Sequence, residues 1–538
     1  MTVISNRNTS PQKLKATLGN TQPAQKNLRN FVGKLQPGLD ELTSQTAIRN
    51  GGKLLLFLLL VASSLSAQPL RLLPQNPHYF QFKGKPTVLV GSGEHYGAVI
   101  NQDFDYKTYL QTLGRDGLNI TRVFTGAYFE KQGAFGIAKN TLAPSPDRLI
   151  LPWSRSTQPG FALGGNKFDL NRWNDAYFTR LKDFMREAER NNVVVEITLF
   201  SSYYGAGWAH SPFNRDNNIS YTDDINPLDV NTPNNGNILA FQEEYVRKIV
   251  RELNGFDNLY YEIQNEPWAD LKDTVLTLNE YFPAEDMKTG QWRAALEVVA
   301  QRANDWQRRV AEWITEEEAK LPKKHLISQN IGNFRYPITD PDPNVSIFNF
   351  HYAHPEAVTM NYHLNKVIGF NETGFAGSND HTYRRQAWRF MLAGGGLFNH
   401  LDYSFSVGAE QGQDTAYQAP GGGSPRLRQH FALLKQFLES LDLPRLRPDA
   451  SLVKAAPGLM HTQTLTNQTN QFIVYAESVS PRTTELVLTL PRGTYTAQWM
   501  DTATGQIEQV ENFTHGHGEK RVTFPKPLAD MVLRIQKQ

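Results

Sequence analysis

Short apolar runs rich in β-branched residues recur along the middle of the chain, and amphipathic stretches separate them. Several runs, such as VVVEITLF, lack the alternation of polar and apolar positions that marks a half-exposed strand. Strands that are buried on both faces have this pattern. The pattern predicts eight strands, at residues 88–90, 118–124, 193–200, 259–264, 325–329, 346–350, 367–370 and 396–401.

The segments between these runs carry apolar residues at spacings of three and four, which predicts helices. The expected helices cover residues 173–191, 238–253, 292–320, 381–393 and 426–441. Strands that alternate with helices eight times favour an α/β fold, a closed parallel (β/α)₈ TIM barrel over residues 68–445. A doubly wound sheet is the alternative, but no Gly-rich dinucleotide-binding turn follows any of the strands.

The pattern changes after the sequence PRLRP at residues 444–448. Segments such as QFIVYAES and TYTAQWMD alternate apolar and polar positions, and turn residues recur every 8–12 positions. This pattern predicts a small antiparallel β-sandwich over residues 446–538. We expect the sandwich to pack against the barrel, with carbohydrate binding as the alternative role.

The first 67 residues form an N-terminal extension that contains the apolar run 54–61. Arg49 and Lys53 precede this run, and small residues follow it up to Ala67, which predicts a secretory signal with cleavage near Ala67. The protein is therefore expected to be exported to the periplasm or the extracellular space. The polar segment before the run is longer than an ordinary signal requires, so an uncleaved membrane tether is the alternative.

The amino-acid composition excludes several kinds of chemistry but does not identify the reaction. The chain has 538 residues, no cysteine and a formal net charge of only +2. The absence of cysteine excludes disulfides, thiolate catalysis and cysteine-ligated metals. No basic block stands out, so nucleic-acid binding has no support.

Three connections that follow predicted strands are long and rich in glycine, proline, asparagine and aromatic residues. They cover residues 125–169, 201–237 and 267–291. In a parallel barrel these connections lie at the carboxyl ends of the strands, where active sites are built. Their many tyrosine and tryptophan side chains argue against solvated linkers.

Two glutamates end predicted strands on that face. Glu266 follows the fourth strand in the sequence Asn-Glu-Pro, and Glu372 ends the seventh. The fourth and seventh strands stand across the barrel mouth, so both side chains can face one cleft. Two facing carboxyl groups are what hydrolysis of a glycosidic bond requires, one protonated and one ionised. A separation of about 5–5.5 Å would indicate a retaining mechanism, and about 6.5–9.5 Å an inverting one.

Asn-Glu-Pro at the end of strand four, with Glu-x-Gly at the end of strand seven, resembles the retaining glycoside hydrolases of clan A, which include the cellulase-type families. The resemblance covers the whole predicted barrel. It implies that Glu266 is the general acid/base, that Glu372 is the nucleophile, and that Asn265 donates a hydrogen bond to the sugar 2-hydroxyl. It also implies a β-linked oligo- or polysaccharide as substrate, with no cofactor and no metal.

Other positions of that pattern also have counterparts in this chain. Arg122, in the second strand, matches the arginine that lies beside the nucleophile and keeps it ionised. His351 and Tyr352 match the His/Tyr pair that ends the sixth strand, where the tyrosine hydroxyl orients the nucleophile. The resemblance therefore implies a supporting role for all three residues.

The eighth strand departs from the family pattern. Many members end this strand in a tryptophan that forms the floor of the sugar site, and this chain has none there. Phe398 or Tyr403 would take its place, or Asn399 and His400 would contact sugar hydroxyls. This departure leaves the identity of the sugar open, as well as the choice between internal and terminal cleavage.

Three further residues are candidates for sugar binding. Glu94 and His95 end the first strand at the barrel mouth, although Glu94 could equally pair with a nearby arginine. Trp268 follows the acid/base motif directly and would either stack on a sugar or pack within its loop. Glu262, in the middle of the fourth strand, is expected to be an interior carboxylate with satisfied hydrogen bonds.

Competing classes of protein lack their own signatures in this sequence. A metallohydrolase on this barrel would need His-x-His at the end of strand one, where only Glu94-His95 stands. A serine hydrolase would need Gly-x-Ser-x-Gly at a strand-to-helix turn, which the chain lacks. The alternative of a different class is a carbohydrate-binding protein that kept the barrel and lost turnover. The presence of both Glu266 and Glu372 argues against it.

Overall fold

The computed structural model describes most of the chain after the N-terminal extension. The predicted signal segment, residues 1–67, and most of the connection 267–291 lie outside the described residues. In the part that is described, no helix has both the length and the apolar character needed to cross a membrane. The described residues are 68–278, 292, 295–458, 460–480 and 484–538.

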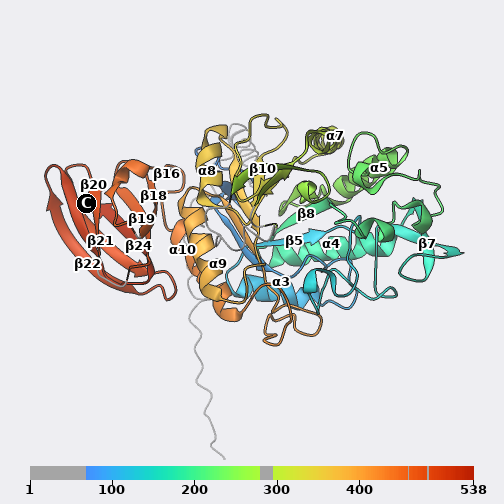
Figure 1. Cartoon of the computed structure of the whole chain (residues 1–538), viewed down its shortest axis with the longest axis horizontal. Helices are drawn as coiled ribbons and strands as arrows, with labels where there is room; N and C mark the ends of the chain where they lie inside the picture. Colours follow the sequence, from blue (N-terminus) through green and yellow to red (C-terminus); the bar gives the residue numbers. More distant parts are fainter. Residues whose placement is uncertain (1–67, 279–291, 293–294, 459, 481–483) are drawn as a thin grey trace, which may run out of the picture. The chain divides into compact units, whose positions relative to one another are not determined.

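Eight parallel strands form a nearly closed barrel, and helices lie around it (Figure 1). Their hydrogen-bonded order is β4-β15-β14-β13-β12-β9-β8-β5. Each strand overlaps one of the eight predicted runs, so the predicted TIM barrel is confirmed. The strands are β4 (Leu89–Gly93), β5 (Ile120–Phe124), β8 (Val194–Ser201), β9 (Leu259–Asn265), β12 (Ile327–Asn333), β13 (Ile347–His351), β14 (Val367–Glu372) and β15 (Leu397–Leu401).

The seam between β4 and β5 lacks a regular ladder. Two backbone hydrogen bonds join it, from Asn119 N to Val90 O at 3.2 Å and from Phe124 N to Tyr96 O at 3.0 Å, together with side-chain bonds. The side chain of Asn119 accepts a hydrogen bond from Val90 N at 2.9 Å and donates one to Val88 O at 2.8 Å. The hydroxyl of Tyr109 accepts a bond from Glu94 N and lies 2.7 Å from Thr121 Oγ1. These two side chains bridge the only gap in the order of the described barrel strands.

Helices follow seven of the eight barrel strands in the described part of the chain, and the link from β12 to β13 is a loop without a helix. The predicted helices 173–191, 238–253, 381–393 and 426–441 correspond to α4, α5, α9 and α10. The helices are α3 (Tyr106–Arg115), α4 (Asp175–Arg190), α5 (Ile238–Leu253), α7 (Gln301–Glu318), α8 (Pro355–Asn361), α9 (Asp380–Leu392) and α10 (Pro425–Glu439).

The helix predicted over residues 292–320 was wrong in its first part. Residues Ala295–Val299 form strand β11, which pairs antiparallel with β10 (Lys272–Leu278), and the helix begins only at Gln301. The run ALEVV fits an apolar face of either a helix or a strand. Pairing with β10 and a bridge from Val298 to Gly332 of β12 favours the strand.

The bottom of the barrel is closed by a small hairpin that precedes it. Strands β1 (Arg71–Leu72), β2 (Phe80–Phe82) and β3 (Lys85–Thr87) form this sheet. Lys83 and Gly84 both have positive φ, as a two-residue hairpin turn requires. Phe80 packs with the first residues of the barrel strands, which leaves the opposite end free for a site.

The connection after β5 is an ordered structure, not a linker. It contains a two-stranded hairpin, β6 (Trp153–Pro159) and β7 (Asn166–Trp173). The aromatic side chains that marked this connection in the sequence pack into the main core, Trp153 against Tyr245 of α5 at 5.1 Å. This packing fixes the loop that later forms one wall of the site.

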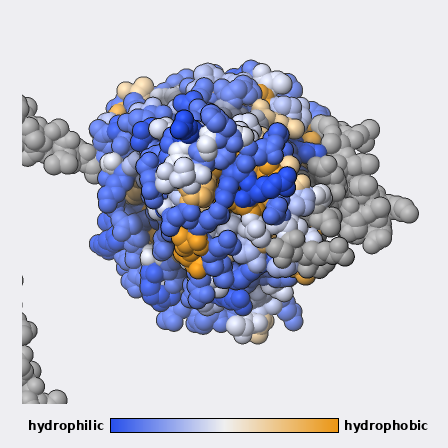
Figure 2. All heavy atoms as spheres, turned by 90° about the vertical axis from the view of Figure 1, so that its left-hand side faces the viewer, coloured by the Kyte–Doolittle hydropathy of each residue, from blue (hydrophilic) through white to orange (hydrophobic). Residues whose placement is uncertain are grey.

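The last 92 residues fold into two antiparallel sheets, as predicted for the sandwich. Their outer surface is mainly hydrophilic, with small separate hydrophobic patches (Figure 2). The sheets have the orders β16-β18-β19-β24-β21-β22 and β17-β20-β23. The strands are β16 (Arg447–Pro448), β17 (Val453–Ala455), β18 (Met460–Thr466), β19 (Gln471–Ser478), β20 (Thr484–Thr489), β21 (Gly493–Asp501), β22 (Ile507–His515), β23 (Glu519–Phe524) and β24 (Asp530–Lys537).

Helix α9 carries the contact between barrel and sandwich. Trp388 stacks on Tyr475 of β19 at 6.1 Å. Arg384 forms an ion pair with Asp530 of β24, whose side chain is fully buried, and Arg389 Nε donates to Glu477 Oε2 at 2.6 Å. The sandwich is therefore joined to the barrel by buried charges as well as by aromatic packing.

Candidate functional site

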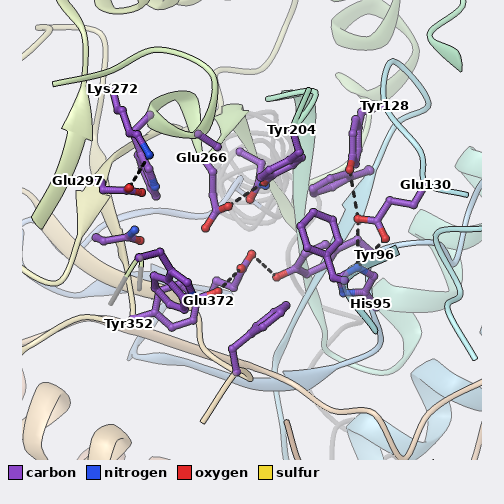
Figure 3. Close-up of a pocket in the computed structure, with 18 residues that line it drawn as sticks. His95, Tyr96, Tyr128, Glu130, Tyr204, Glu266, Lys272, Glu297, Tyr352 and Glu372 are labelled. Atoms are coloured by element: carbon purple, nitrogen blue, oxygen red, sulfur yellow. Dashed lines mark hydrogen bonds and ion pairs between the residues drawn. The ribbon is translucent and has the colours of Figure 1, made fainter. Parts of the chain in front are cut away.

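A cavity of about 290 Å³ lies at the carboxyl ends of the barrel strands (Figure 3). Its lining is largely aromatic, with a few charged and amide groups directed inward. Glu266 and Glu372 face one another near its centre. Other polar and aromatic residues that line the cavity include His95, Tyr96, Tyr128, Glu130, Tyr204, Asn265, Lys272, Glu297, Asn333 and Tyr352.

Glu266 directly follows β9 and has a left-handed backbone, with φ of +45°. Its amide donates to Asn330 Oδ1 on the neighbouring strand β12 at 3.1 Å, which fixes the turn. Tyr204 donates from its hydroxyl to Glu266 Oε2 at 2.8 Å. Burial raises the pKa of Glu266 to about 7, although the Tyr204 bond and the Arg122 charge oppose this shift. The carboxyl group is therefore partly protonated at neutral pH.

Glu372 is the last residue of β14, and three groups donate hydrogen bonds to it. Tyr96 donates to Oε2 at 2.8 Å, Arg122 to Oε2 at 3.1 Å, and Tyr352 to Oε1 at 3.1 Å. Two tyrosine hydroxyls and one guanidinium group thus hold this carboxyl group. Glu266 and Glu372 thus have different surroundings, one mainly desolvated and one surrounded by donors.

His351, at the end of β13, lies between the two carboxyl groups. Its Nδ1 is 2.8 Å from Glu266 Oε1 and 3.5 Å from Glu372 Oε1. Burial lowers the pKa of His351 to about 4, so the ring is neutral at neutral pH. An oxygen of each glutamate and a nitrogen of His351 all lie within 4.8 Å of one another. This trio is also the group of described residues that could hold a metal ion.

Arg122, on β5, connects Glu372 to the interior of the barrel. The residue is 1% exposed. Besides Glu372, its guanidinium group contacts Glu196 Oε1 at 2.7 Å and donates to Asn265 Oδ1 at 2.9 Å. The amide nitrogen of Asn265 is thereby turned toward the cavity, where it lies 2.7 Å from the Tyr204 hydroxyl.

A layer of interior polar groups lies beneath the site. Glu262 accepts hydrogen bonds from Asn330, Ser328 and Asn349, and Glu196 accepts one from Asn371 at 2.9 Å. Burial raises the pKa of Glu262, and the neighbouring Glu196 charge adds to this shift. The expectation of an interior carboxylate with satisfied bonds agrees with these contacts. Asn330 also binds the amide of Glu266, so the layer supports the backbone above it.

Several residues at the strand ends share a left-handed backbone although none is glycine. Tyr96, Tyr204, Glu266 and Tyr352 have φ between +45° and +63°. Such conformations cost of order 1–3 kcal/mol each and persist where the surrounding structure imposes them. Each of these side chains lines the cavity and binds one of the two glutamates or is itself one.

The cavity has a charged pair at each end (Figure 3). At one end His95 Nε2 lies 3.3 Å from Glu130 Oε2. At the other end Lys272 Nζ lies 2.7 Å from Glu297 Oε1. The two central glutamates lie between these pairs.

Some of the sequence-predicted site residues lie outside the cavity. Asn399 and His400 are buried within β15, where His400 Nδ1 contacts Ser92 Oγ and Asn399 Nδ2 donates to Asn371 O. These two residues do not line the cavity, because they lie inside the strand, below the level of its end. Tyr403 is also buried, with its ring 6.3 Å from that of His95, and does not line the cavity.

Of the remaining predicted residues, some line the cavity and others only hold neighbouring backbone in place. Asn265, His95, Tyr352 and Trp268 line the cavity, and Trp268 packs edge-on against His351 at 5.3 Å. Glu94 does not line it. The carboxyl of Glu94 accepts bonds from the backbone amides of Gly97 and Ala98 and from Thr141, rather than pairing with an arginine.

The sequence assigned no specific role to Tyr96, Tyr204 or Glu130. Tyr96 stands two residues after Glu94 at the end of the first strand, and that position was its available signal. Tyr204 has the same kind of position, three residues after β8 ends. Glu130 sits within an irregular loop, and no periodic pattern points to it.

Neither the models of known protein families nor the curated protein sequences gave a match to this chain. Solved structures did. A member of glycoside hydrolase family 5 from Bacteroides vulgatus ATCC 8482 is 13% identical, with a TM-score of 0.57 over 87% of this chain and 94% of its own. Another protein from the same strain, described as a candidate glycoside hydrolase, gives 0.59 at 13% identity over 88% of this chain and 83% of its own.

A third solved structure, described as a glycoside hydrolase, is 13% identical and gives a TM-score of 0.56 over 88% of this chain and 97% of its own. At such identities a structural likeness establishes the fold, while function has to be argued from the site. The chain therefore shares its fold, over barrel and sandwich together, with glycoside hydrolases.

Proposed function

We propose that the protein is a retaining glycoside hydrolase that cleaves β-glycosidic bonds of an oligo- or polysaccharide. One observation carries this proposal: Glu266 and Glu372 face one cavity with oxygen atoms within 4.8 Å, one desolvated and the other held by three donors. This difference suits a pair in which one carboxyl donates a proton and the other attacks. The fold shared with glycoside hydrolases supports the same conclusion.

In the first step a Glu372 oxygen attacks the anomeric carbon of the sugar. The bond from that carbon to the leaving oxygen breaks, and Glu266 gives its proton to the leaving oxygen. The sugar is then held as an ester on Glu372. The raised pKa of Glu266 keeps a proton available for this transfer at neutral pH.

In the second step water attacks the same carbon and the ester bond to Glu372 breaks. Glu266, now ionised, accepts the proton of that water. Two inversions give net retention of the anomeric configuration. The close approach of the two carboxyl groups supports this mechanism, because an inverting enzyme needs about 6.5–9.5 Å between them to admit a water.

The neighbouring side chains have roles in this scheme. Arg122 and Tyr96 hold the attacking oxygen of Glu372 and balance its charge. Asn265 presents its amide nitrogen toward the position of the sugar 2-hydroxyl, since its oxygen is occupied by Arg122. Tyr352 fixes the second oxygen of Glu372, and Trp268 offers an aromatic surface on the side of Glu266.

Trapping the covalent intermediate tests the proposal most directly. A 2-fluoro glycoside with a good leaving group forms the ester rapidly and hydrolyses it slowly. After proteolysis and mass spectrometry, we expect the label on Glu372. A label on another residue would overturn the assignment.

Substitution of the two glutamates separates an enzyme from a carbohydrate-binding protein that has lost turnover. We expect Glu372→Gln to abolish hydrolysis of aryl β-glycosides, and Glu266→Gln to lower it by about 10²–10⁴-fold. A panel of β-glucosides, β-mannosides, β-xylosides and β-galactosides identifies the sugar. Wild-type protein that binds saccharides but hydrolyses none of the panel would favour the binding protein.

The carbohydrate substrate fits the predicted export of the protein, since polysaccharides are met outside the cell. We propose that residues 1–67 direct this export, with cleavage near Ala67. N-terminal sequencing of the protein recovered from its native host would show the mature start.

A further inference from the structure

We infer that the cavity is closed on the side of the terminal sugar by Glu130 and His95, so that the enzyme acts on the non-reducing end of its saccharide. This inference rests on the proposed function and deepens it. It selects terminal cleavage of the saccharide over internal cleavage.

The two glutamates set the position of the bond that breaks. The anomeric carbon must lie at Glu372 and the leaving oxygen at Glu266. The sugar ring lies across the line that joins the two carboxyl groups, and we place it on the side of Tyr96 and His95, which line the cavity there (Figure 3). The leaving part of the saccharide extends the other way, toward Lys272.

Few side chains separate Glu372 from the end wall. The Tyr96 hydroxyl binds Glu372, and the Tyr96 ring stacks on that of His95 at 5.2 Å. His95 in turn contacts Glu130 at 3.3 Å. The distance from the nucleophile to the wall is thus the combined length of the Tyr96 and His95 side chains. A space of that length suits a short terminal piece of saccharide.

The wall is built from buried and connected groups. Glu130 accepts hydrogen bonds from Tyr128 and from the side chain of Asn140. Its backbone amide donates to Leu142 O at 3.0 Å. Asn140, Thr141 and Leu142 behind it are all buried, and Thr141 binds Glu94. A second loop holds this one in place, since Ala138 N donates to Gln418 O at 2.9 Å.

Aromatic rings continue the wall above the cavity. Phe135 lies edge-on to Tyr204 at 5.0 Å and 6.5 Å from Phe375, and Tyr128 lies 5.9 Å from Tyr204. Rings at these spacings are in contact, so no sugar ring passes between them. They separate the site from an outer cavity of about 220 Å³.

A second cavity adjoins the site on the opposite side. It has a volume of about 440 Å³, shares Tyr352 and Phe375 with the first and reaches His461 of strand β18. Tyr352 lies on the far side of Glu372 from His95 (Figure 3).

The end wall also carries groups that suit sugar hydroxyls. The two oxygens of Glu130 are acceptors at the cavity surface. His95 Nδ1 is buried and has no hydrogen-bond partner among the described residues. A buried polar atom without a partner is unfavourable, and a hydroxyl of the terminal sugar would satisfy it. Glu130 and His95 thus determine specificity for the terminal sugar.

Oligosaccharides with free and blocked ends test this inference. The probes are cellohexaose, mannohexaose and xylohexaose, labelled at the reducing end, each also prepared with a 4-O-benzyl group on the non-reducing terminal sugar. We expect one hexaose to be shortened by pieces of one fixed length, and its blocked form to react about 100-fold more slowly or worse. Products of several lengths at the first turnovers, or equal rates for blocked and free forms, would overturn the inference.

Variants at the wall provide the second test. Glu130→Gln keeps the shape of the side chain and should raise KM for the matching aryl glycoside about tenfold or more. Asp147→Asn is the matched control, because Asp147 lies exposed in the same connection. Melting curves of both variants check that the loop remains folded. An unchanged KM in folded Glu130→Gln would contradict the proposed role.

A binding measurement keeps this inference separate from the proposed function. Calorimetric titration with deoxynojirimycin and deoxymannojirimycin measures occupancy of the terminal-sugar side without turnover. If no saccharide is hydrolysed, the proposed function fails, while affinity for an iminosugar that Glu130→Gln weakens still supports the wall as a sugar site. If neither iminosugar binds, or the variant binds equally, the inference fails even when hydrolysis is observed.

Discussion

Arg122 donates a hydrogen bond from Nη1 to Glu372 Oε2 at 3.1 Å from a position that solvent does not reach. The same guanidinium group faces Glu196 and Glu262. One buried cation therefore serves three buried carboxyl groups. Three ionised carboxyl groups would carry more negative charge than one arginine balances. Because burial raises the pKa of Glu262 and of Glu196, protonation removes part of this excess negative charge.

Replacement of Arg122 by methionine should be strongly destabilising. The change leaves buried carboxylates without their cation, at a cost of about 3–5 kcal/mol. Urea unfolding at pH 7 measures this loss, which should shrink at lower pH as the carboxyl groups take up protons. Arg445→Met is the control, since Arg445 is 69% exposed in its pair with Asp442 and should change stability by about 1 kcal/mol or less. Equal stability of the two variants would contradict the role given to Arg122.

The pH dependence of the reaction should follow Glu266. Burial raises the pKa of this group to about 7, and the proposed mechanism needs its protonated form for the first step. The value of kcat/KM should therefore fall as pH rises through about 7. In Glu266→Gln the residual kcat/KM should lose this alkaline limb. A wild-type profile that stays flat up to pH 9 would argue against Glu266 as the acid.

Stability should also fall with rising pH, because of buried carboxyl groups that retain protons in the fold. Burial raises the pKa of Glu94 to about 7, above its usual value of 4.5. Between these values the folded protein binds more protons than the unfolded chain, so stability is full below the lower value and is lost as pH rises through about 7. Melting temperatures from pH 5 to pH 8.5 measure this trend. Glu94→Gln should flatten it, and a slope unchanged by that variant would assign the trend to other groups.

Metal removal distinguishes the two chemistries that the central trio permits. Glu266, His351 and Glu372 could ligate an ion, but two carboxyl groups alone suffice for the proposed mechanism. We expect dialysis against a chelator to leave kcat/KM unchanged. Added Zn²⁺ should inhibit, since it would occupy the groups that transfer the proton and attack. Activity that disappears with the chelator and returns with a metal would point to a metallohydrolase.

The barrel strands could be predicted because each is a local run whose residues are all buried, as in Val194–Ser201. The helix at 292–320 was wrong because its first residues pair with β10, a contact that depends on chain folding rather than on local pattern. The loop that replaces a helix between β12 and β13 is likewise set by tertiary packing. Local pattern therefore predicts buried elements better than it predicts edges.

The positions of Glu266 and Glu372 could be predicted because a strand end fixes where a side chain lies in a parallel barrel. Their roles stay predictions until the trapping experiment. Glu130 could not be found in this way, since it reaches the cavity through an irregular loop held by Leu142 and Gln418. The burial of His400 could not be predicted, because its contacts with Ser92 and Tyr383 join distant parts of the chain.

The seam between β4 and β5 has a consequence for how the barrel moves. Ladders of backbone hydrogen bonds open cooperatively, whereas this seam has only two backbone bonds and the side-chain bonds of Asn119 and Tyr109 to break when it opens locally. That seam leads directly to His95 and Tyr96, the residues at the closed end of the cavity. We therefore expect local opening of the barrel to begin at this seam, and a sugar bound beside it to hold the first two strands together.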